Sequence, residues 1–301
     1  MDMAGLLRGY WQRAKTGVKI PVGPVTVLIK ALRTQKISGN RLWPRQRPSN
    51  GMWRPPALAS VAAEASHGVA LIVGVGPGVG AALARRFAAA GMDVALASRD
   101  AGRLQPLVAE LHCLGRQARA YGCDATDELS VKRLFTKVAF DLGAPELAVY
   151  NCEAFGPGGI LDTNPSAFEN CWKVNCFGAF LVARGALPAM LDRGRGTIIF
   201  TGPTGSLRGR AGFVNLAVGK SGARMLAQSM AREFSPQGVH VAHVVIDGPV
   251  LTPMNADTVE ERGEEGLLHP DAVAETLYQL HRQHKTCWTH ELDLRPSVEP
   301  F

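Results

Sequence analysis

Four glycines stand at alternate positions in the segment Leu71–Gly80, which reads LIVGVGPGVG: Gly74, Gly76, Gly78 and Gly80. The apolar residues before the first glycine are typical of a short buried strand, and the alanine-rich run after the last predicts a helix. Glycines let the backbone come close to a pyrophosphate, and the free N–H groups and dipole of a helix N-terminus hold an anion. The pattern therefore predicts a site for a nucleotide diphosphate.

The spacing of these glycines differs from the common fingerprint G-x-G-x-x-G, because Val79 occupies the position of the last glycine. It reads instead as G-x-x-x-G-x-G. Tight turns also need glycine, so the cluster alone is weak support for a ligand site. The helical spacing of Leu83 and Phe87, with Gly91 to end the helix, strengthens the interpretation.

Apolar runs of strand length alternate with helical patterns along the chain. The predicted strands are 69–73, 93–97, 117–121, 147–150, 197–200, 239–246 and 289–294. The predicted helices are 81–90, 104–114, 127–142, 166–190, 212–234 and 271–284. Strands that alternate with long helices form right-handed crossovers and a parallel sheet covered on both faces. We predict an α/β fold, in which residues 67–301 form a single doubly wound (Rossmann-type) domain with a seven-stranded parallel sheet and helices on both faces.

The net charge of +7 over 301 residues is unevenly distributed. Residues 1–66 contain eleven Lys or Arg and two acids, a charge of +9, whereas the remainder has 22 basic and 24 acidic residues, a charge of −2. The body of the protein therefore has no basic face that indicates nucleic-acid binding. A nucleic-acid role for the basic leader would rest on its charge alone.

Residues 1–66 leave several interpretations open. The segment fits a disordered basic leader, a solvated arm or a transit peptide. It also fits translation from an upstream start codon, with Met52 as the true initiator. An N-terminal peptide map of the native protein would distinguish these alternatives.

Six cysteines show no C-x-x-C motif and no pairing with histidine at zinc spacing. Reduced thiols in a cytoplasmic protein without a bound metal are the simplest interpretation. The best apolar run, 20–32, is short and contains two prolines and Lys30, so we expect no membrane span.

From about residue 68 to 301 the chain resembles the short-chain dehydrogenase/reductase family. Gly74, Gly78 and Gly80 fall on the glycine motif of that family. The other matches, in the order of the family, are Asp124 with Ala125, Asn151, Asn175, Lys220, and Gly248, Val250 and Thr252 within the segment DGPVLT. The resemblance implies that Asp124 lies against an adenine ring and that Asn175 and Lys220 belong to the active site. It also implies a small-molecule substrate and a homodimer or homotetramer formed through helices 166–190 and 212–234.

The choice between NAD and NADP is predicted from the charge of the residues at the end of the second strand. Sites that prefer NAD place a carboxylate there to bond the ribose 2′-hydroxyl. Here Ser98 occupies that place and Arg99 follows, with Asp100 next. A guanidinium binds a 2′-phosphate through two charge-assisted hydrogen bonds, whereas a carboxylate repels it. We predict NADP(H) over NAD(H).

Two catalytic groups of the family are missing. The tyrosine expected four residues before Lys220 is Leu216, and the expected serine falls on Pro203. Ketone reduction places negative charge on oxygen, and a positioned acid must protonate it. Leucine has no proton to donate, so the ordinary carbonyl reductase mechanism is not available.

Three substitutes are open. Thr201 or Thr204 can orient a carbonyl, and Thr204 is included with Asn175 and Lys220 as a candidate catalytic residue. Tyr150 and Glu153 flank Asn151 where the nicotinamide is expected, although Glu153 also fits a solvated loop acid. Alternatively, the substrate is an enoyl compound whose enolate takes its proton from water.

The function predicted is an oxidoreductase with an altered active site, acting on an enoyl or carbonyl substrate. The alternative is a catalytically silent NADP(H)-binding redox sensor or scaffold.

Overall fold

The computed structural model describes residues 68–254 and 256–299. The predictions made for residues 1–66 lie outside this range. The described part begins one residue before the first strand, so the whole glycine-rich segment and its surroundings are included.

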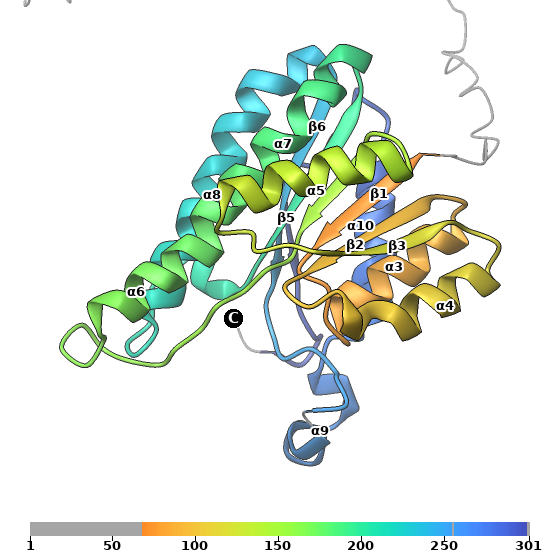
Figure 1. The fold of residues 1–301 in the computed structure, drawn as a ribbon. Helices are drawn as coiled ribbons and strands as arrows, with labels where there is room; N and C mark the ends of the chain where they lie inside the picture. Colours follow the sequence, from red (N-terminus) through yellow and green to blue (C-terminus); the bar gives the residue numbers. More distant parts are fainter. Residues whose placement is uncertain (1–67, 255, 300–301) are drawn as a thin grey trace, which may run out of the picture. The chain divides into compact units, whose positions relative to one another are not determined.

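Seven strands form one parallel sheet with the order β3-β2-β1-β4-β5-β6-β7 (Figure 1). They are β1 Val69–Val73, β2 Asp93–Ser98, β3 Ala118–Gly122, β4 Leu147–Tyr150, β5 Gly196–Gly202, β6 Val239–Ile246 and β7 Glu291–Leu294. The strand order reverses between β1 and β4, because the chain first builds outward through β2 and β3. Open α/β sheets bind ligands at such a switch point, beyond the carboxyl ends of the strands.

Helices cover both faces of the sheet, as predicted. They are α3 Val79–Ala89, α4 Gln105–Cys113, α5 Glu128–Asp141, α6 Pro165–Trp172, α7 Gly178–Arg193, α8 Val214–Phe234, α9 Ala256–Arg262 and α10 Pro270–Arg282. Figure 1 shows α5, α7 and α8 on one face and α3, α4 and α10 on the other. The short helix α9 was not predicted; it lies between β6 and α10, away from the sheet.

Two apolar cores lie on opposite faces of the sheet, since successive strand residues point to opposite sides. Leu71 and Val73 of β1 belong to the core with α5, α7 and α8, whereas Ala70 and Ile72 pack with α3 and α10. All five residues of β1 are buried. A strand buried on both faces needs a continuous apolar run, which explains why its sequence VALIV shows no polar alternation.

The long helical stretch predicted at 166–190 is divided by a turn of π-helix at residues 173–177. The buried hydroxyl of Tyr150 donates a hydrogen bond to the carbonyl oxygen of Val174 within that turn. Gly178 makes room for it, because a Cβ on Gly178 would lie 2.3 Å from the Tyr150 hydroxyl oxygen. A side chain inserted into the helical hydrogen-bond ladder is a recognised cause of such a bulge.

Among the described residues, the helical stretch 165–193 is long and apolar enough to cross a membrane by length and composition, with a mean hydropathy of 1.5. Core helices of globular proteins pass the same test. Residues of α7 contact β4, β5 and α8, and 44% of the apolar window is buried within the protein. Packing against the sheet therefore accounts for its apolar composition.

Candidate functional site

The glycine turn after β1 is shaped by close approaches of the backbone. Gly74 has φ +96°, and a Cβ on it would lie 2.6 Å from the backbone nitrogen of Cys152. A Cβ on Gly80 would lie 2.8 Å from the Cα of Val75, whereas one on Gly76 would meet nothing within 4 Å. Gly76 therefore faces open space, into which a bound group can approach the backbone.

Helix α3 begins at Val79, directly after this turn, with Gly78 as its N-cap residue. No side chain caps this helix end. The first N–H groups of a helix have no acceptor within the helix, and they carry the positive end of its dipole. The start of α3 and the open face at Gly76 are therefore suited to bind an anion.

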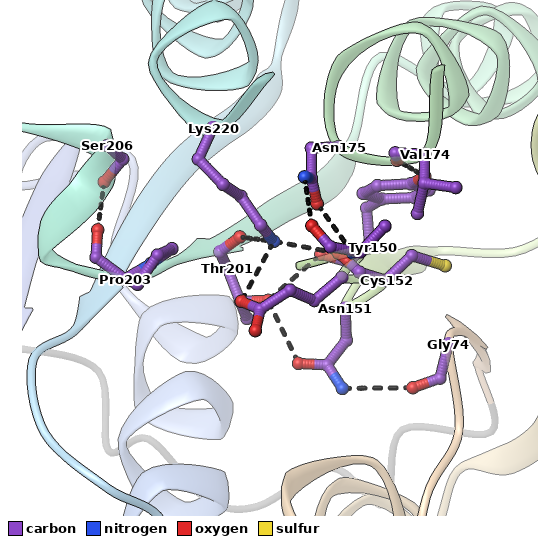
Figure 2. Close-up of polar contacts among 12 residues, drawn as sticks. Gly74, Tyr150, Asn151, Cys152, Val174, Asn175, Thr201, Pro203, Ser206 and Lys220 are labelled. Carbon is purple, nitrogen blue, oxygen red and sulfur yellow. Dashed lines mark hydrogen bonds and ion pairs between the residues drawn. The ribbon is translucent and has the colours of Figure 1, made fainter. Parts of the chain in front are cut away.

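Asn151 ties this turn to the neighbouring strands at the switch point. Its Nδ2 donates to the carbonyl of Gly74 at 3.0 Å, and its Oδ1 accepts from the Thr201 hydroxyl at 3.0 Å (Figure 2). Three strand ends, those of β1, β4 and β5, are thus joined by one amide. The hydrogen bonds fix the edge of the sheet at which a ligand would lie.

A cleft of about 810 Å³ runs along this edge. At one end it is lined by residues that follow β2 and β3, namely Ser98, Arg99, Asp100, Arg103, Asp124, Ala125 and Thr126. Gly74 and Gly76 line its middle. At the other end it is lined by residues after β4 and from α6 and α8, including Asn151, Glu153, Phe155, Asn170, Cys171 and Asn215.

The first end of the cleft is lined by two guanidinium groups and two carboxylates, those of Arg99, Arg103, Asp100 and Asp124. Ser98 donates its hydroxyl proton to the carbonyl of Asp100 at 2.6 Å, and this hydrogen bond spans Arg99. The Asp124 carboxylate accepts from both the backbone N–H and the hydroxyl of Thr126, at 2.9 and 2.7 Å. These hydrogen bonds lower the pKa of Asp124 and orient its side chain at the cleft.

Lys220 lies behind the other end of the cleft, and its side chain is only 3% exposed. Its ammonium donates to the carbonyl oxygens of Cys152 at 2.8 Å and Thr201 at 3.2 Å (Figure 2). The Glu153 carboxylate lies 3.9 Å from the same nitrogen. Burial lowers the pKa of Lys220, and the neighbouring Glu153 opposes that effect.

Asn175 lies in the π-helical turn and is fully buried. Its side-chain amide pairs with the backbone of Ala154 in both directions: Nδ2 donates to the carbonyl at 2.7 Å, and Oδ1 accepts from the N–H at 3.0 Å. The amide therefore holds the segment that follows β4 in the manner of a neighbouring strand.

Thr204 does not line the cleft described above. Its hydroxyl donates to the carboxylate of Asp247, which in turn is paired with Arg295 at 2.9 Å. Leu216 is 7% exposed, and its side chain lies against Gly205: a Cβ added to Gly205 would be 3.8 Å from it. Neither residue presents an acidic proton to the cleft.

Tyr150 also has no free proton to offer. Its ring is 1% exposed and its hydroxyl is bonded to Val174, and burial raises the pKa of the phenol well above its ordinary value. The adjacent Cys152 thiol has a pKa raised to about 11, chiefly by burial. The predicted role of Tyr150 as a substitute proton donor is therefore not supported by its geometry, which gives it a structural role.

The segment after β6 approaches the glycine turn. A Cβ on Gly78 would lie 3.0 Å from Cγ2 of Thr252 and 3.8 Å from Cγ1 of Val250. Gly248 has φ +152° and lies against Pro296. Val250 and Thr252 therefore lie beside the start of α3, whereas Gly248 lies against Pro296, and none of the three lines the described cleft.

Sequence reasoning missed several residues that line the cleft, chiefly Arg103, Asn170, Cys171 and Asn215. Arg103 stands four residues after Arg99, a spacing that could have been noticed. The Asn215 side chain is buried, and its Nδ2 donates to the Gly156 carbonyl at 3.1 Å. It precedes Leu216, but only the tertiary structure brings it to the cleft.

Residues 68–263 match the short chain dehydrogenase family. The chain belongs to the short-chain dehydrogenase/reductase family. It is 34% identical over 189 residues to a short-chain dehydrogenase/reductase of Armillaria gallica, a match that covers 62% of this chain and 72% of the relative. As a member of the family, the protein is an oxidoreductase of the short-chain dehydrogenase/reductase type.

Solved structures of the family share the fold. A short-chain dehydrogenase from Rhodopseudomonas palustris superposes with a TM-score of 0.67 at 36% identity, over 76% of this chain and 98% of that chain. A metagenomic short-chain oxidoreductase in complex with NADP gives a TM-score of 0.68 at 26% identity, over 78% and 99%. Among the residues that the structure describes here, no cluster of three or more His, Cys, Asp or Glu side chains could hold a metal ion.

Proposed function

We propose that this protein is an NADP(H)-dependent oxidoreductase with a non-standard proton-donor arrangement, which acts on an enoyl or carbonyl substrate. The observation that carries the proposal is the cleft itself. It has an anion cradle at Gly76 and the start of α3, and Arg99 and Arg103 at one end. The family includes a relative solved with NADP, which supports the choice of cofactor.

Different residues would bind different parts of the proposed cofactor. Gly74, Gly76, Gly78, Val79 and Gly80 would hold the diphosphate. Ser98 and Arg99 would hold the 2′-phosphate, and Asp124 and Ala125 the adenine. The other half would be held by Asn151, Lys220, Gly248, Val250 and Thr252. When bound, the nicotinamide supplies or accepts a hydride.

The proton is the part of the reaction that this chain handles differently. Leu216 has no acidic group, Pro203 has no hydroxyl, and Thr204 is bonded to Asp247. Removing a general acid commonly costs about 10²–10⁴ in rate. When hydride is added to an enoyl compound, the negative charge develops on an enolate, which water can protonate in a later step. An enoyl substrate is therefore favoured over a simple ketone. Asn175 and Lys220 would then act by holding the backbone beside the substrate.

We also infer a homodimer or homotetramer formed through α7 and α8. Both helices carry large apolar side chains that are exposed in the single chain, including Phe180, Val218 and Met225. Exposed apolar residues on adjacent helices are typical of an oligomer interface. All six cysteines are unpaired, which is consistent with the proposed cytoplasmic location.

The proposed function is tested in two steps. Calorimetry with NADPH and NADH on the purified protein should give a dissociation constant for NADPH well below that for NADH. NADPH oxidation is then measured against a panel of enoyl thioesters, quinones and ketones, with turnover expected for the enoyl compounds. Absence of binding to either nucleotide at millimolar concentration would refute the proposal.

A catalytically silent NADP(H)-binding protein is the second candidate. The burial of Leu216 and the engagement of Thr204 favour it, because a nucleotide cleft remains while familiar proton donors are absent. Under this alternative NADPH binds without turnover of any substrate, and binding changes the affinity for a partner protein. Partner affinity that is equal with and without NADPH would exclude it.

A further inference from the structure

Glu153 combines three properties in the described part of the chain. It follows β4 by three residues, it lines the cleft, and its side chain is 50% exposed. The sequence alone also allowed a solvated loop acid. The contacts of its neighbours distinguish it from an ordinary loop residue.

The backbone on both sides of Glu153 is fixed by buried side chains. Lys220 donates to the carbonyl of Cys152 at 2.8 Å, and Asn175 pairs with the N–H and carbonyl of Ala154. The Cα of Glu153 therefore lies between two anchored peptide groups. Its carboxylate is presented to the cleft from a rigid base rather than from a mobile loop.

The charges of Glu153 and Lys220 are oriented relative to the cleft. The carboxylate lies 3.9 Å from the ammonium, but the Lys220 side chain is 3% exposed while that of Glu153 is 50% exposed. The negative end of the pair therefore faces the ligand space, and the positive end is turned into the protein. Among the described residues that line this end of the cleft, all the others are uncharged; they include Asn151, Phe155, Asn170, Cys171, Val174 and Asn215.

The position of this charge along the cleft follows from the proposed function, on which the inference rests. The diphosphate is assigned to the glycine turn in the middle, and the 2′-phosphate to the Arg99 end. A dinucleotide that crosses the switch point must then extend its other half toward residues 151–156. That half carries the nicotinamide, which is positively charged when oxidised and neutral when reduced.

We propose that the Glu153 carboxylate makes this end of the cleft selective for oxidised NADP⁺ over reduced NADPH. A fixed negative charge attracts the cationic oxidised ring. The reduced ring has no net charge, so it is not attracted in this way. At a separation of about 6 Å and an effective dielectric constant of about 40, this attraction corresponds to roughly a tenfold difference in affinity. The same preference would make bound NADPH a stronger hydride donor, or report the oxidised state in a silent sensor.

The test measures dissociation constants by calorimetry for NADP⁺, NADPH and adenosine 2′,5′-bisphosphate, which lacks the nicotinamide half. Glu153→Gln keeps the size of the side chain and removes its charge. We expect the ratio of the NADP⁺ constant to the NADPH constant to rise about tenfold in this variant. The affinity for the bisphosphate should not change, which also shows that the variant is folded.

Glu275→Gln is the matched control, because Glu275 pairs with Arg86 on the α3/α10 face and does not line the cleft. It should leave all three constants unchanged. If Glu153→Gln binds all three ligands with an unchanged ratio, the inference is overturned and the proposed function stands. If the wild-type protein binds neither dinucleotide, the proposed function and the inference both fail. Glu153→Ala repeats the comparison without an amide.

Discussion

At the scale of a single residue, Arg99 is the side chain to which we assign the proposed preference for NADP(H). It lines the cleft together with Arg103, and the neighbouring Ser98 hydroxyl and Asp124 carboxylate are already engaged in local hydrogen bonds. In the proposed site the guanidinium would bind the ligand phosphate, and Thr126 orients the adjacent carboxylate. A planar fork of donors suits the oxygens of a 2′-phosphate.

We expect Arg99→Asp to weaken NADPH binding by roughly 10- to 100-fold, because a charge-assisted pair is lost and a like charge is introduced. The affinity for NADH, which has no 2′-phosphate, should change by much less. Calorimetry with both nucleotides measures the two effects. Arg119→Asp reverses a charge on β3 away from the cleft and serves as the control. An unchanged NADPH constant in Arg99→Asp would contradict the proposed phosphate site.

At the scale of single elements, the π-helical turn shows how a core residue shapes the site. Tyr150 is the last residue of β4, and its hydroxyl donates a hydrogen bond to the Val174 carbonyl within the π-helical turn. The same turn carries Asn175, whose amide holds Ala154 beside the cleft. The site geometry at Ala154 therefore depends on a tyrosine that itself does not touch the cleft.

Tyr150→Phe should lower the free energy of unfolding by about 1–3 kcal/mol, because the buried Val174 carbonyl loses its donor. NADPH affinity should remain within a few-fold of the wild type, since the phenol is not part of the proposed cofactor site. Denaturant unfolding and calorimetry measure the two quantities. Tyr278→Phe removes a hydroxyl on α10 and should change stability by less than about 0.5 kcal/mol. A large loss of affinity with no loss of stability in Tyr150→Phe would instead indicate a direct role in binding.

The sequence predicted the elements well, because their signals are local. The seven strands lie within two residues of the predicted ends, since apolar runs such as 69–73 and 239–246 are buried on both faces. The division of helix 166–190 was not predicted. It depends on Tyr150, whose hydroxyl comes from a strand 24 residues earlier in the chain. A hydrogen bond between distant segments leaves no periodic pattern in the sequence.

The candidate site was predictable only in part, for the same reason. The glycine turn and Arg99 are visible as a motif with a strand before it and a charge after the next strand. Asn215 reaches the cleft only through the packing of α8, and the direction of Glu153 depends on the burial of Lys220. Spacing along the chain identifies the elements that meet at the sheet edge, but side-chain contacts across that edge require the fold.

At the scale of the whole molecule, we expect His243 of β6 and His281 of α10 to make stability depend on pH, because burial lowers the pKa of each. His243 of β6 is fully buried, with the Glu291 carboxylate 3.9 Å away. Burial lowers its pKa from 6.5 to about 4, with Glu291 raising it and Arg224, Lys220 and His290 lowering it. The pKa of His281 is likewise lowered by burial to about 4.

Because these folded pKa values lie below the unfolded value, the unfolded chain binds protons first as the pH falls. We therefore expect the contribution of these histidines to stability to be complete above about pH 6.5 and to be lost progressively between pH 6.5 and 4, by up to about 3 kcal/mol for each histidine. We expect the free energy of unfolding to fall less between pH 7.5 and pH 4.5 in His243→Leu than in the wild type. Denaturant unfolding at a series of pH values gives the slope directly. His269→Leu, which removes a half-exposed ring, is the control for the loss of an imidazole. An equal slope in His243→Leu and the wild type would show that the proton uptake on unfolding arises elsewhere in the chain.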